Sequence, residues 1–247
     1  MRPTNVGLLT MKLRSAALTD IGKVRLENQD CPLCQPVLGL FGVADGVGGL
    51  PGGAEASECA VRTLTQAVRD AKGEPDLGAI LESANAAVQR LGMLVSPETG
   101  IGTTVSCGLF RAGRVRLAHV GDSRAYLLRG EKLLSVTEDH TVEVEARKRQ
   151  MPGEYLLLHP QSGHTLTRCV GQPTPLETDL TEHALAAGDR WLFATDGVTR
   201  MVSDPELAEL LGRAGEPAEI LRAMIDLALV RGGSDNATAV LVIADEA

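Results

Sequence analysis

The sequence lacks the long apolar runs of membrane-bound and secreted proteins. Its longest early apolar stretch, residues 6–11, is interrupted by Gly7 and Thr10 and is shorter than a signal-peptide core, and no later stretch approaches a membrane span. Positive charge is also scarce, since 24 Lys and Arg face 32 Asp and Glu for a formal net charge of −8. This balance argues against nucleic acid or an anionic membrane as the main partner. We therefore expect a soluble, cytoplasmic protein.

Cysteine is sparse, with five residues in the whole chain. An odd number at this low density does not fit a secreted disulfide scaffold and favours a reducing compartment. Cys31 and Cys34 have the spacing of a redox or zinc motif, but no second close Cys or His pair completes a zinc site and no helix follows. A structural interpretation of this pair is therefore favoured.

Several catalytic and nucleotide-binding motifs are also missing. The loop with Gly46 and Gly48 has Pro51 where a dinucleotide-binding GxGxxG needs its last glycine, and no GK[ST] sequence occurs anywhere. Neither a GxSxG elbow nor a Cys followed six positions later by Arg is present. These absences exclude the common nucleotide sites and leave covalent catalysis without a candidate nucleophile.

The chain reads as one domain. No internal repeat, low-complexity tract or linker divides its 247 residues, and 44% hydrophobic content is enough for a full core. We expect residues 1–14 to be a flexible extension, with Met11 as suitable a start as Met1, and residues 15–247 to form the domain. The polar segment 140–165 is expected to be a surface flap that handles substrates.

Helical spacing of apolar residues predicts two separated pairs of helices. The first helix follows a glycine-rich loop at 46–53, and a second begins after Pro75. The other pair is expected near 205–213 and 217–230.

Strand patterns occupy much of the remaining chain. Apolar runs at 37–44, 190–195 and 237–244 predict strands, and period-two alternation with turns over 103–136 predicts an antiparallel meander. Because the helices form two pairs and do not alternate with strands, two stacked antiparallel sheets are favoured over a doubly wound parallel sheet. The expected fold is an α+β, four-layer αββα sandwich with one helix pair on each outer side.

Four apolar strand candidates each adjoin an aspartate beside a small residue: Asp45, Asp122, Asp196 and Asp235. Singly, each has an ordinary explanation, because Asp and Gly are common in turns. If they converge, carboxylates about 4 Å apart repel by roughly 4 kcal/mol at an effective dielectric near 20, so a cation is required. Oxygen ligands suit Mg²⁺ or Mn²⁺, whereas the His and Cys positions lack the clustering of a zinc site.

These aspartates belong to a longer series of motifs. Each motif alone is weak, but six in this order and spacing are specific as a set. The series resembles the bacterial branch of the PP2C-type, or PPM, Ser/Thr phosphatases over about residues 15–243, and its segments are 19–30, 44–49, 121–126, 137–140, 195–197 and 234–238. The resemblance implies hydrolysis of phosphoserine or phosphothreonine on proteins and opposition to a bacterial Ser/Thr protein kinase in signalling or secretion control. Because the sequence has no heptad pattern and no obvious apolar run outside the core, a monomer is the default expectation.

The resemblance also implies a set of metal ligands. Asp45 would bridge two core ions, Gly46 would offer its carbonyl to the first, and Asp196 with Asp235 would complete the second. Asp122, together with Asp196, would hold a third, weaker ion. A water bridging the two core ions, either Mn²⁺ or Mg²⁺, would attack phosphorus directly, without a phosphoenzyme.

Other positions carry implied supporting roles. Arg25 matches the phosphate-binding arginine, while Asp30 and Asn236 match residues that orient the ligands or the bound water. The sequence departs from the pattern of the family at two positions. Val47 stands where some eukaryotic relatives carry a histidine proposed as general acid, and Gln29 replaces a carboxylate, so the acid stays unassigned.

Alternatives remain open at this point. His140, which follows Asp139, is a possible acid, but a hydrogen-bonded structural role is favoured for it, as for His119 and Arg168. The remaining histidines, His159, His164 and His183, receive no role. A catalytically weak phosphoprotein-binding module and a small-molecule phosphoesterase are the competing functions.

Overall fold

The computed structural model describes residues 11–48, 51–150, 163–173 and 175–245. The strands are β1 (Lys12–Asp20), β2 (Asp30–Gln35), β3 (Leu40–Asp45), β4 (Val105–Arg111), β5 (Arg114–Val120), β6 (Arg124–Arg129), β7 (Lys132–Ser135), β8 (Asp179–Ala184), β9 (Arg190–Ala194) and β10 (Ala237–Asp245). The helices are η1 (Pro36–Leu38), α1 (Gly53–Asp70), α2 (Leu77–Val95), α3 (Val142–Lys148), α5 (Asp196–Thr199), α6 (Asp204–Gly212) and α7 (Pro217–Val230).

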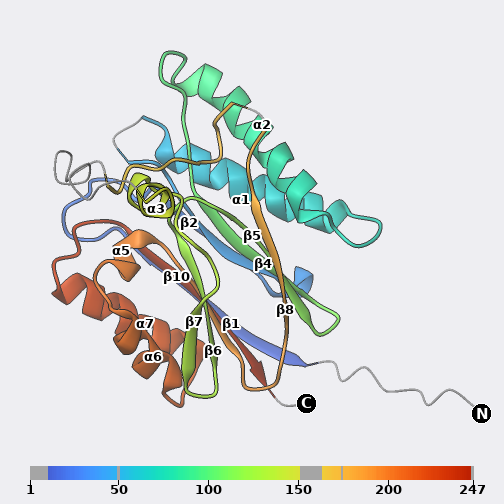
Figure 1. The fold of residues 1–247 in the computed structure, drawn as a ribbon, viewed down its shortest axis with the longest axis vertical. Coiled ribbons are helices and arrows are strands. Elements are labelled where there is room, and N and C mark those ends of the chain that lie inside the picture. The colour runs from blue at the N-terminus through green and yellow to red at the C-terminus, as the bar shows by residue number, and fades with distance from the viewer. Residues whose placement is uncertain (1–10, 49–50, 151–162, 174, 246–247) are drawn as a thin grey trace, which may run out of the picture.

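The strands form two antiparallel sheets that lie face to face. One has the order β1-β10-β9-β6-β7 and the other β2-β3-β4-β5-β8. Helices α1 and α2 cover the outer face of the second sheet, and α6 and α7 cover that of the first (Figure 1). The predicted αββα sandwich is confirmed. Within the described residues, no helix combines the length and apolarity needed to cross a membrane.

The central strands are buried on both faces, which explains their apolar runs. In β3, Leu40 and Ala44 pack toward α1 and α2, while Phe41 and Val43 pack between the sheets. Aromatic rings fill the layer between the sheets, where Phe41 meets Phe110 edge to face with centroids 5.3 Å apart. This packing holds the two sheets, and therefore their strand ends, in a fixed relation.

The predicted meander over 103–136 is wrong. Strands β4 and β5 belong to one sheet, whereas β6 and β7 belong to the other. The chain crosses between sheets through the connection 121–123, where Gly121 has a φ of +111° that side chains rarely adopt. Period-two alternation identifies strands but does not specify their neighbours, so both sheets produce the same pattern.

The edge strand β8 was not predicted. It pairs with β5 alone, and most of its side chains are exposed. A strand at the edge of a sheet can be polar, so its sequence lacks the apolar alternation by which strands are recognised.

The predicted start of the domain needs correction. Strand β1 begins at Lys12, which pairs with Asp245, so residues 12–14 are part of the sheet and not of an extension. Arg14 fixes this end by donating two hydrogen bonds to the Asp245 carboxylate, at 2.7 and 3.0 Å. Residues 1–10 lie outside the described part of the chain.

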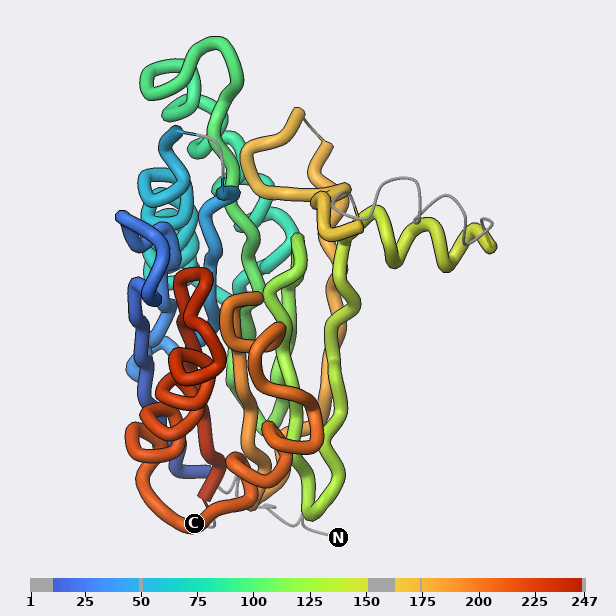
Figure 2. Tube along the Cα trace, turned by 90° about the vertical axis from the view of Figure 1, so that its left-hand side faces the viewer, coloured from blue at the N-terminus to red at the C-terminus, as the bar shows by residue number. Residues whose placement is uncertain are grey.

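The predicted flap contains a short helix, α3, which projects from the body of the sandwich (Figure 2). The beginning and end of the flap are joined by backbone hydrogen bonds, from Val142 to Thr165 at 2.9 Å and from Glu143 to Gly163 at 3.0 Å. Residues 151–162 of the prediction lie outside the described residues. The role of the flap in substrate handling stays a prediction.

The two cysteines with motif spacing lie on opposite faces of β2. Cys31 packs toward α1 and α2, and Cys34 packs between the sheets. Residues three apart in a strand point in opposite directions, so this pair cannot chelate one ion or form a disulfide with each other. The structural interpretation therefore holds.

An ion pair between a half-exposed arginine and a buried aspartate offers a test of the sheet packing. Arg129 donates two hydrogen bonds of 2.7 Å to the Asp189 carboxylate, and the Asp189 side chain is fully buried. Arg129→Ala would leave that charge without its partner, so we expect the free energy of unfolding to fall by about 3 kcal/mol. Urea denaturation measures it.

The matched control is Arg114→Ala, because Arg114 pairs with Glu182 at 3.2 Å with both side chains about half exposed. This substitution should cost less than about 1 kcal/mol. Equal small losses for the two variants would contradict the assignment of the Arg129 pair as structural.

Candidate metal centre

One cavity, of about 590 Å³, gathers the predicted site residues from distant parts of the chain. The predicted residues that line it are Arg25, Asp45, Gly46, Asp122, Asp196, Asp235 and Asn236. The remaining predicted residue, Asp30, is buried beside the cavity, since it is the register partner of Asp45 on the neighbouring strand β2. The residues selected from the sequence therefore meet in one place.

The aspartates converge because most of them lie at or beside the ends of strands. Asp45 ends β3 in one sheet, while Asp196 follows β9 and Asp235 precedes β10 in the other sheet. Asp122 lies in the connection that crosses between the sheets. Because both sheets contribute, the carboxylates meet only when the two sheets are stacked.

The glycines next to the aspartates serve close packing. Neither Gly46 nor Gly197 has a positive φ, so turn geometry does not explain them. A Cβ on Gly46 would collide with the backbone of Gly53, and one on Gly197 would collide with the Asn236 carbonyl. The Asp-Gly pairs therefore allow α1 to approach β3 and α5 to approach β10.

Threonine hydroxyls fix the backbone of Asp45 and the carboxylate of Asp30. Thr104 Oγ1 accepts a hydrogen bond from the Asp45 amide at 3.1 Å, and Thr103 Oγ1 donates one to the Asp45 carbonyl at 2.9 Å. Thr195 Oγ1 donates to Asp30 Oδ2 at 2.8 Å. Sequence reasoning assigned these threonines no role, because a hydroxyl next to the end of a strand has no diagnostic spacing.

The Asn236 side chain fixes the loop that carries Arg25. Its Oδ1 accepts from the Gln29 amide at 2.8 Å, and its Nδ2 donates to the carbonyls of Ile21 and Glu27, each at 2.9 Å. These bonds bind the β1–β2 loop to the start of β10. Asn236 therefore supports the site by shaping this loop.

Arg25 extends from that loop to the rim of the cavity. Its Nη2 lies 2.7 Å from Asp235 Oδ2, and its side chain is 40% exposed. A Cβ on Gly48 would lie 3.3 Å from both terminal guanidinium nitrogens, so a larger residue there would crowd the arginine. The guanidinium is thus held beside a predicted metal ligand with one side open to solvent.

Burial makes the charged form of the aspartates unfavourable. Burial, reinforced by the neighbouring carboxylates, raises the pKa of Asp45 well above its ordinary value. The same causes raise the pKa of Asp30 and of Asp122 to about 7, although hydrogen bonds to Asp30 and the charge of Arg200 near Asp122 act in the opposite direction. The pKa of Asp196 is also raised by burial, against the charge of Arg200.

The donor set fits a hard divalent cation. Its ligating atoms are carboxylate oxygens, and Oδ1 of Asp30 is buried with no hydrogen-bond partner among the described residues. Across the described ranges, no three His, Cys, Asp or Glu side chains stand in a ready-made ligand cluster. Two of the predicted ligands are paired with arginines instead, since Asp235 lies 2.7 Å from Arg25 and Asp196 lies 2.7 Å from Arg200.

His140 has a structural place outside the cavity lining. It is 1% exposed, its Nδ1 accepts from the Gly121 amide at 3.1 Å, and its Nε2 lies 3.1 Å from Asp179 Oδ2. His119 is likewise held by Ser106 and by the Glu138 carbonyl. The structural interpretation of both histidines is therefore favoured.

Two basic residues without a predicted role also line the cavity. His164 lines it from the end of the flap, and Arg200 lines it from the end of α5. Arg200 lies four residues after Asp196, a helical spacing that could have indicated the ion pair. His164 had no such signal.

Comparison with known proteins gives a consistent result. A family model described as "Protein phosphatase 2C" matches residues 28–219. "Serine/threonine protein phosphatase PstP" of Mycobacterium tuberculosis is 35% identical over 241 residues, covering 96% of this chain and 46% of PstP, so the chain spans about half the length of that relative. A "Putative protein phosphatase 2C-type" of Streptococcus pyogenes is 34% identical over 91% of this chain and 94% of its own.

The fold also matches solved structures. The catalytic domain of PstP "in complex with 2 Manganese ions" superposes with a TM-score of 0.80 at 34% identity, over 96% of this chain and all of that domain.

The raised carboxylate pKa values predict how metal-free stability depends on pH. The pKa of Asp30 and Asp122 is raised from 3.8 to about 7, so in this interval the folded state keeps protons that the unfolded state has released. The free energy of unfolding in EDTA should therefore fall as pH rises from about 4 to about 7. Thermal unfolding at several pH values measures this.

Bound Mn²⁺ should oppose the same repulsion, so its stabilising effect should be larger at about pH 7 than at about pH 5. Asp45→Asn, which removes one buried charge, should weaken both trends. A melting temperature in EDTA that does not change over this interval would contradict the electrostatic account.

Proposed function

The chain belongs to the protein phosphatase 2C family, and from that premise we propose that it is a metal-dependent protein serine/threonine phosphatase. One observation carries the proposal: carboxylates from both sheets and a partly exposed arginine share a single cavity. Carboxylates suit hard cations, and an arginine fork suits phosphoryl oxygens. A cavity with both suits a phosphate ester.

The proposed metal ligands are those that the sequence singled out. Asp45 and the Gly46 carbonyl, with Asp196 and Asp235, would hold two core ions, Mn²⁺ or Mg²⁺, as the two manganese ions reported for PstP support. Such ions, when bound, lower the pKa of water and polarise phosphoryl oxygens. Asp30, buried beside Asp45, would support the first ion through its unpartnered oxygen.

Arg25 would bind the phosphoryl group of the substrate. Its guanidinium lies at the cavity rim, paired with Asp235, and it is held by a loop that Asn236 ties to the start of β10. A substrate phosphate can accept two hydrogen bonds from the guanidinium, which would neutralise the negative charge that develops on the phosphoryl oxygens. The arginine therefore has to be shared between Asp235 and the substrate.

The proposed reaction is direct hydrolysis. A water oxygen forms a bond to phosphorus, the bond from phosphorus to the seryl or threonyl oxygen breaks, and that oxygen takes a proton. Cys169 is the thiol that lines the cavity, but burial raises its pKa, which disfavours the thiolate that a covalent route needs. No phosphoenzyme is therefore required.

The leaving oxygen needs a proton source. His164 lines the cavity and is exposed to solvent, and an imidazolium N–H can donate a proton to a leaving oxygen. Val47, where some relatives of the family carry histidine, also lines the cavity but has no proton to give. We therefore assign the general acid to His164.

The finer expectations concern substrates and partners. Phosphorylated proteins are the proposed substrates, and a bacterial Ser/Thr protein kinase is the proposed opponent, in line with the bacterial relatives named serine/threonine phosphatases. The flap, residues 140–165, is the proposed substrate-selecting element. The third, weaker ion expected at Asp122 and Asp196 meets an obstacle, because both carboxylates are paired with Arg200.

The main test is metal-dependent hydrolysis. With Mn²⁺, the protein should release phosphate from a phosphothreonine peptide and from p-nitrophenyl phosphate, and EDTA should abolish both activities. Asp45→Asn should lower turnover by at least about 100-fold, because removing a metal ligand reduces activity more than removing a residue that only supports a ligand. Asp226→Asn, at an exposed position on α7, is the matched control and should retain activity.

Two results would favour the alternatives. Retention of the phosphopeptide without any Mn²⁺-dependent turnover would indicate a phosphoprotein-binding module. Turnover of phosphorylated metabolites with none of phosphopeptides would indicate a small-molecule phosphoesterase.

The role of His164 predicts a split between two substrates. p-Nitrophenolate leaves without protonation, whereas a seryl oxygen does not, so His164→Gln should slow the phosphoserine peptide by about 100-fold and change p-nitrophenyl phosphate little. His183→Gln, on the edge strand β8, is the matched control. Equal losses on the two substrates would exclude His164 as the acid.

A further inference from the structure

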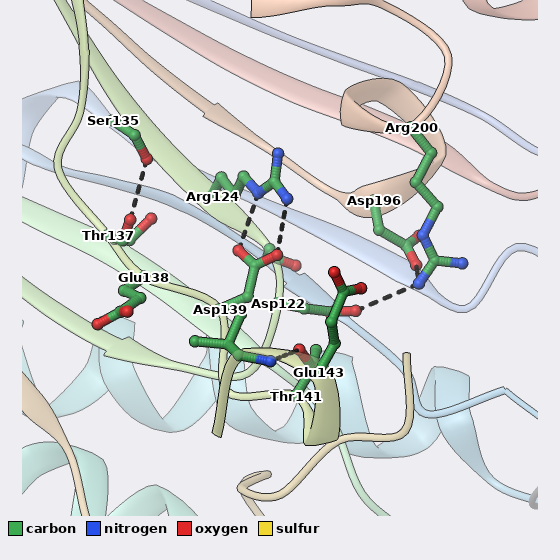
Figure 3. A network of polar contacts seen from close by, with 12 residues as sticks. Asp122, Arg124, Ser135, Thr137, Glu138, Asp139, Thr141, Glu143, Asp196 and Arg200 are labelled. Carbon is green, nitrogen blue, oxygen red and sulfur yellow. Dashed lines mark hydrogen bonds and ion pairs between the residues drawn. The ribbon is translucent and has the colours of Figure 1, made fainter. Parts of the chain in front are cut away.

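Arg200 bridges two carboxylates that come from different parts of the fold. Its Nη2 lies 2.7 Å from Asp196 Oδ2, at the start of α5, and 3.4 Å from Asp122 Oδ2, in the connection between β5 and β6 (Figure 3). The two carboxylates are 15% and 9% exposed as side chains, so they have little access to water. One guanidinium thus supplies positive charge to both.

The position of Arg200 is set by the backbone. Asp196 begins α5 and Arg200 caps its end, which places the two side chains on one face of a single helical turn. The Arg200 amide donates to the Asp196 carbonyl at 2.9 Å, closing that turn. A guanidinium is charged at all relevant pH values, so the tethered cation is always present.

A metal ion between the same two carboxylates would be poorly held. It would have two side-chain ligands, and Mg²⁺ or Mn²⁺ prefers six oxygens, so the rest would be water. It would also have to displace the guanidinium from Oδ2 of both aspartates. A weakly ligated ion from solution competes badly with a cation attached four residues away.

We propose that Arg200 is a built-in cation that takes the place of the third metal ion, so that this chain binds two ions and closes the remaining site with its own side chain. The inference rests on the proposed function, because it assumes the two core ions at Asp45, Asp196 and Asp235. Arg200 differs from Arg25 in that its guanidinium contacts two carboxylates and Arg25 contacts one. Arg25 is thus the arginine left for the substrate.

The test counts bound metal in the absence of substrate. Mn²⁺ titrations followed by electron paramagnetic resonance of the free ion should give about two ions per wild-type chain, as in two-metal sites. Arg200→Ala should bind about one more, with weaker affinity, because the two carboxylates become available. Adding Asp122→Asn to that variant should remove the extra ion.

Arg213→Ala is the matched control. Arg213 forms an ion pair of the same i,i+4 spacing with Glu209, at 2.9 Å, on α6 and away from the cavity. This variant should bind Mn²⁺ as the wild type does. Arg200→Gln, which keeps most of the side-chain volume, should also gain the extra ion and serves if the alanine variant unfolds.

Two outcomes would overturn the inference while leaving the proposed function intact: three ions bound by the wild type, or the same number bound by the wild type and by a folded Arg200 variant. Absence of any Mn²⁺ binding by the wild type is a different result. It would overturn the proposed function first, and this inference with it.

Discussion

Mutual repulsion of buried carboxylates is the constraint on which the rest of the site depends. Asp30, Asp45, Asp122 and Asp196 lie close enough, and deep enough, for burial and neighbouring charge to raise the pKa of each one. Such a group is stable only if protons, arginines or metal ions neutralise it. This arrangement lowers the stability of the metal-free fold, as expected where carboxylates are grouped to bind cations.

The remaining residues of the site offset the repulsion between the carboxylates in two ways. Uncharged groups fix the backbone around the carboxylates: the hydroxyls of Thr103, Thr104 and Thr195 and the amide of Asn236 are all engaged within the protein. Two arginines then supply charge. Arg200 contacts two carboxylates, whereas Arg25 contacts one from a loop at the rim, and both side chains are 40% exposed. The proposal that Arg200 is a structural cation and that Arg25 meets the phosphate rests on this difference in the number of carboxylate partners.

Prediction from the sequence succeeded where a local pattern carried the information. The four longest helices, α1, α2, α6 and α7, follow from helical spacing, and the aspartates follow from their position beside apolar runs. Prediction failed where the information was not local. Strand alternation over 103–136 could not show that the chain changes sheets at Gly121, and the polar edge strand β8 had no apolar pattern. The pairing of Lys12 with Asp245 joins the two ends of the described chain, which no window of sequence contains.

The sequence by itself determined the candidate ligands, because the choice of Asp, Gly and Arg in ordered motifs already limits the predicted chemistry to oxygen donors and an arginine suited to phosphate. Only the tertiary structure decided how these groups are used. Stacking the sheets brings Asp45 and Asp196 into one cavity, and it also brings Arg200 against Asp122. The physical reason is that charge interactions depend on distance and burial, and both are created by packing between segments far apart in the chain.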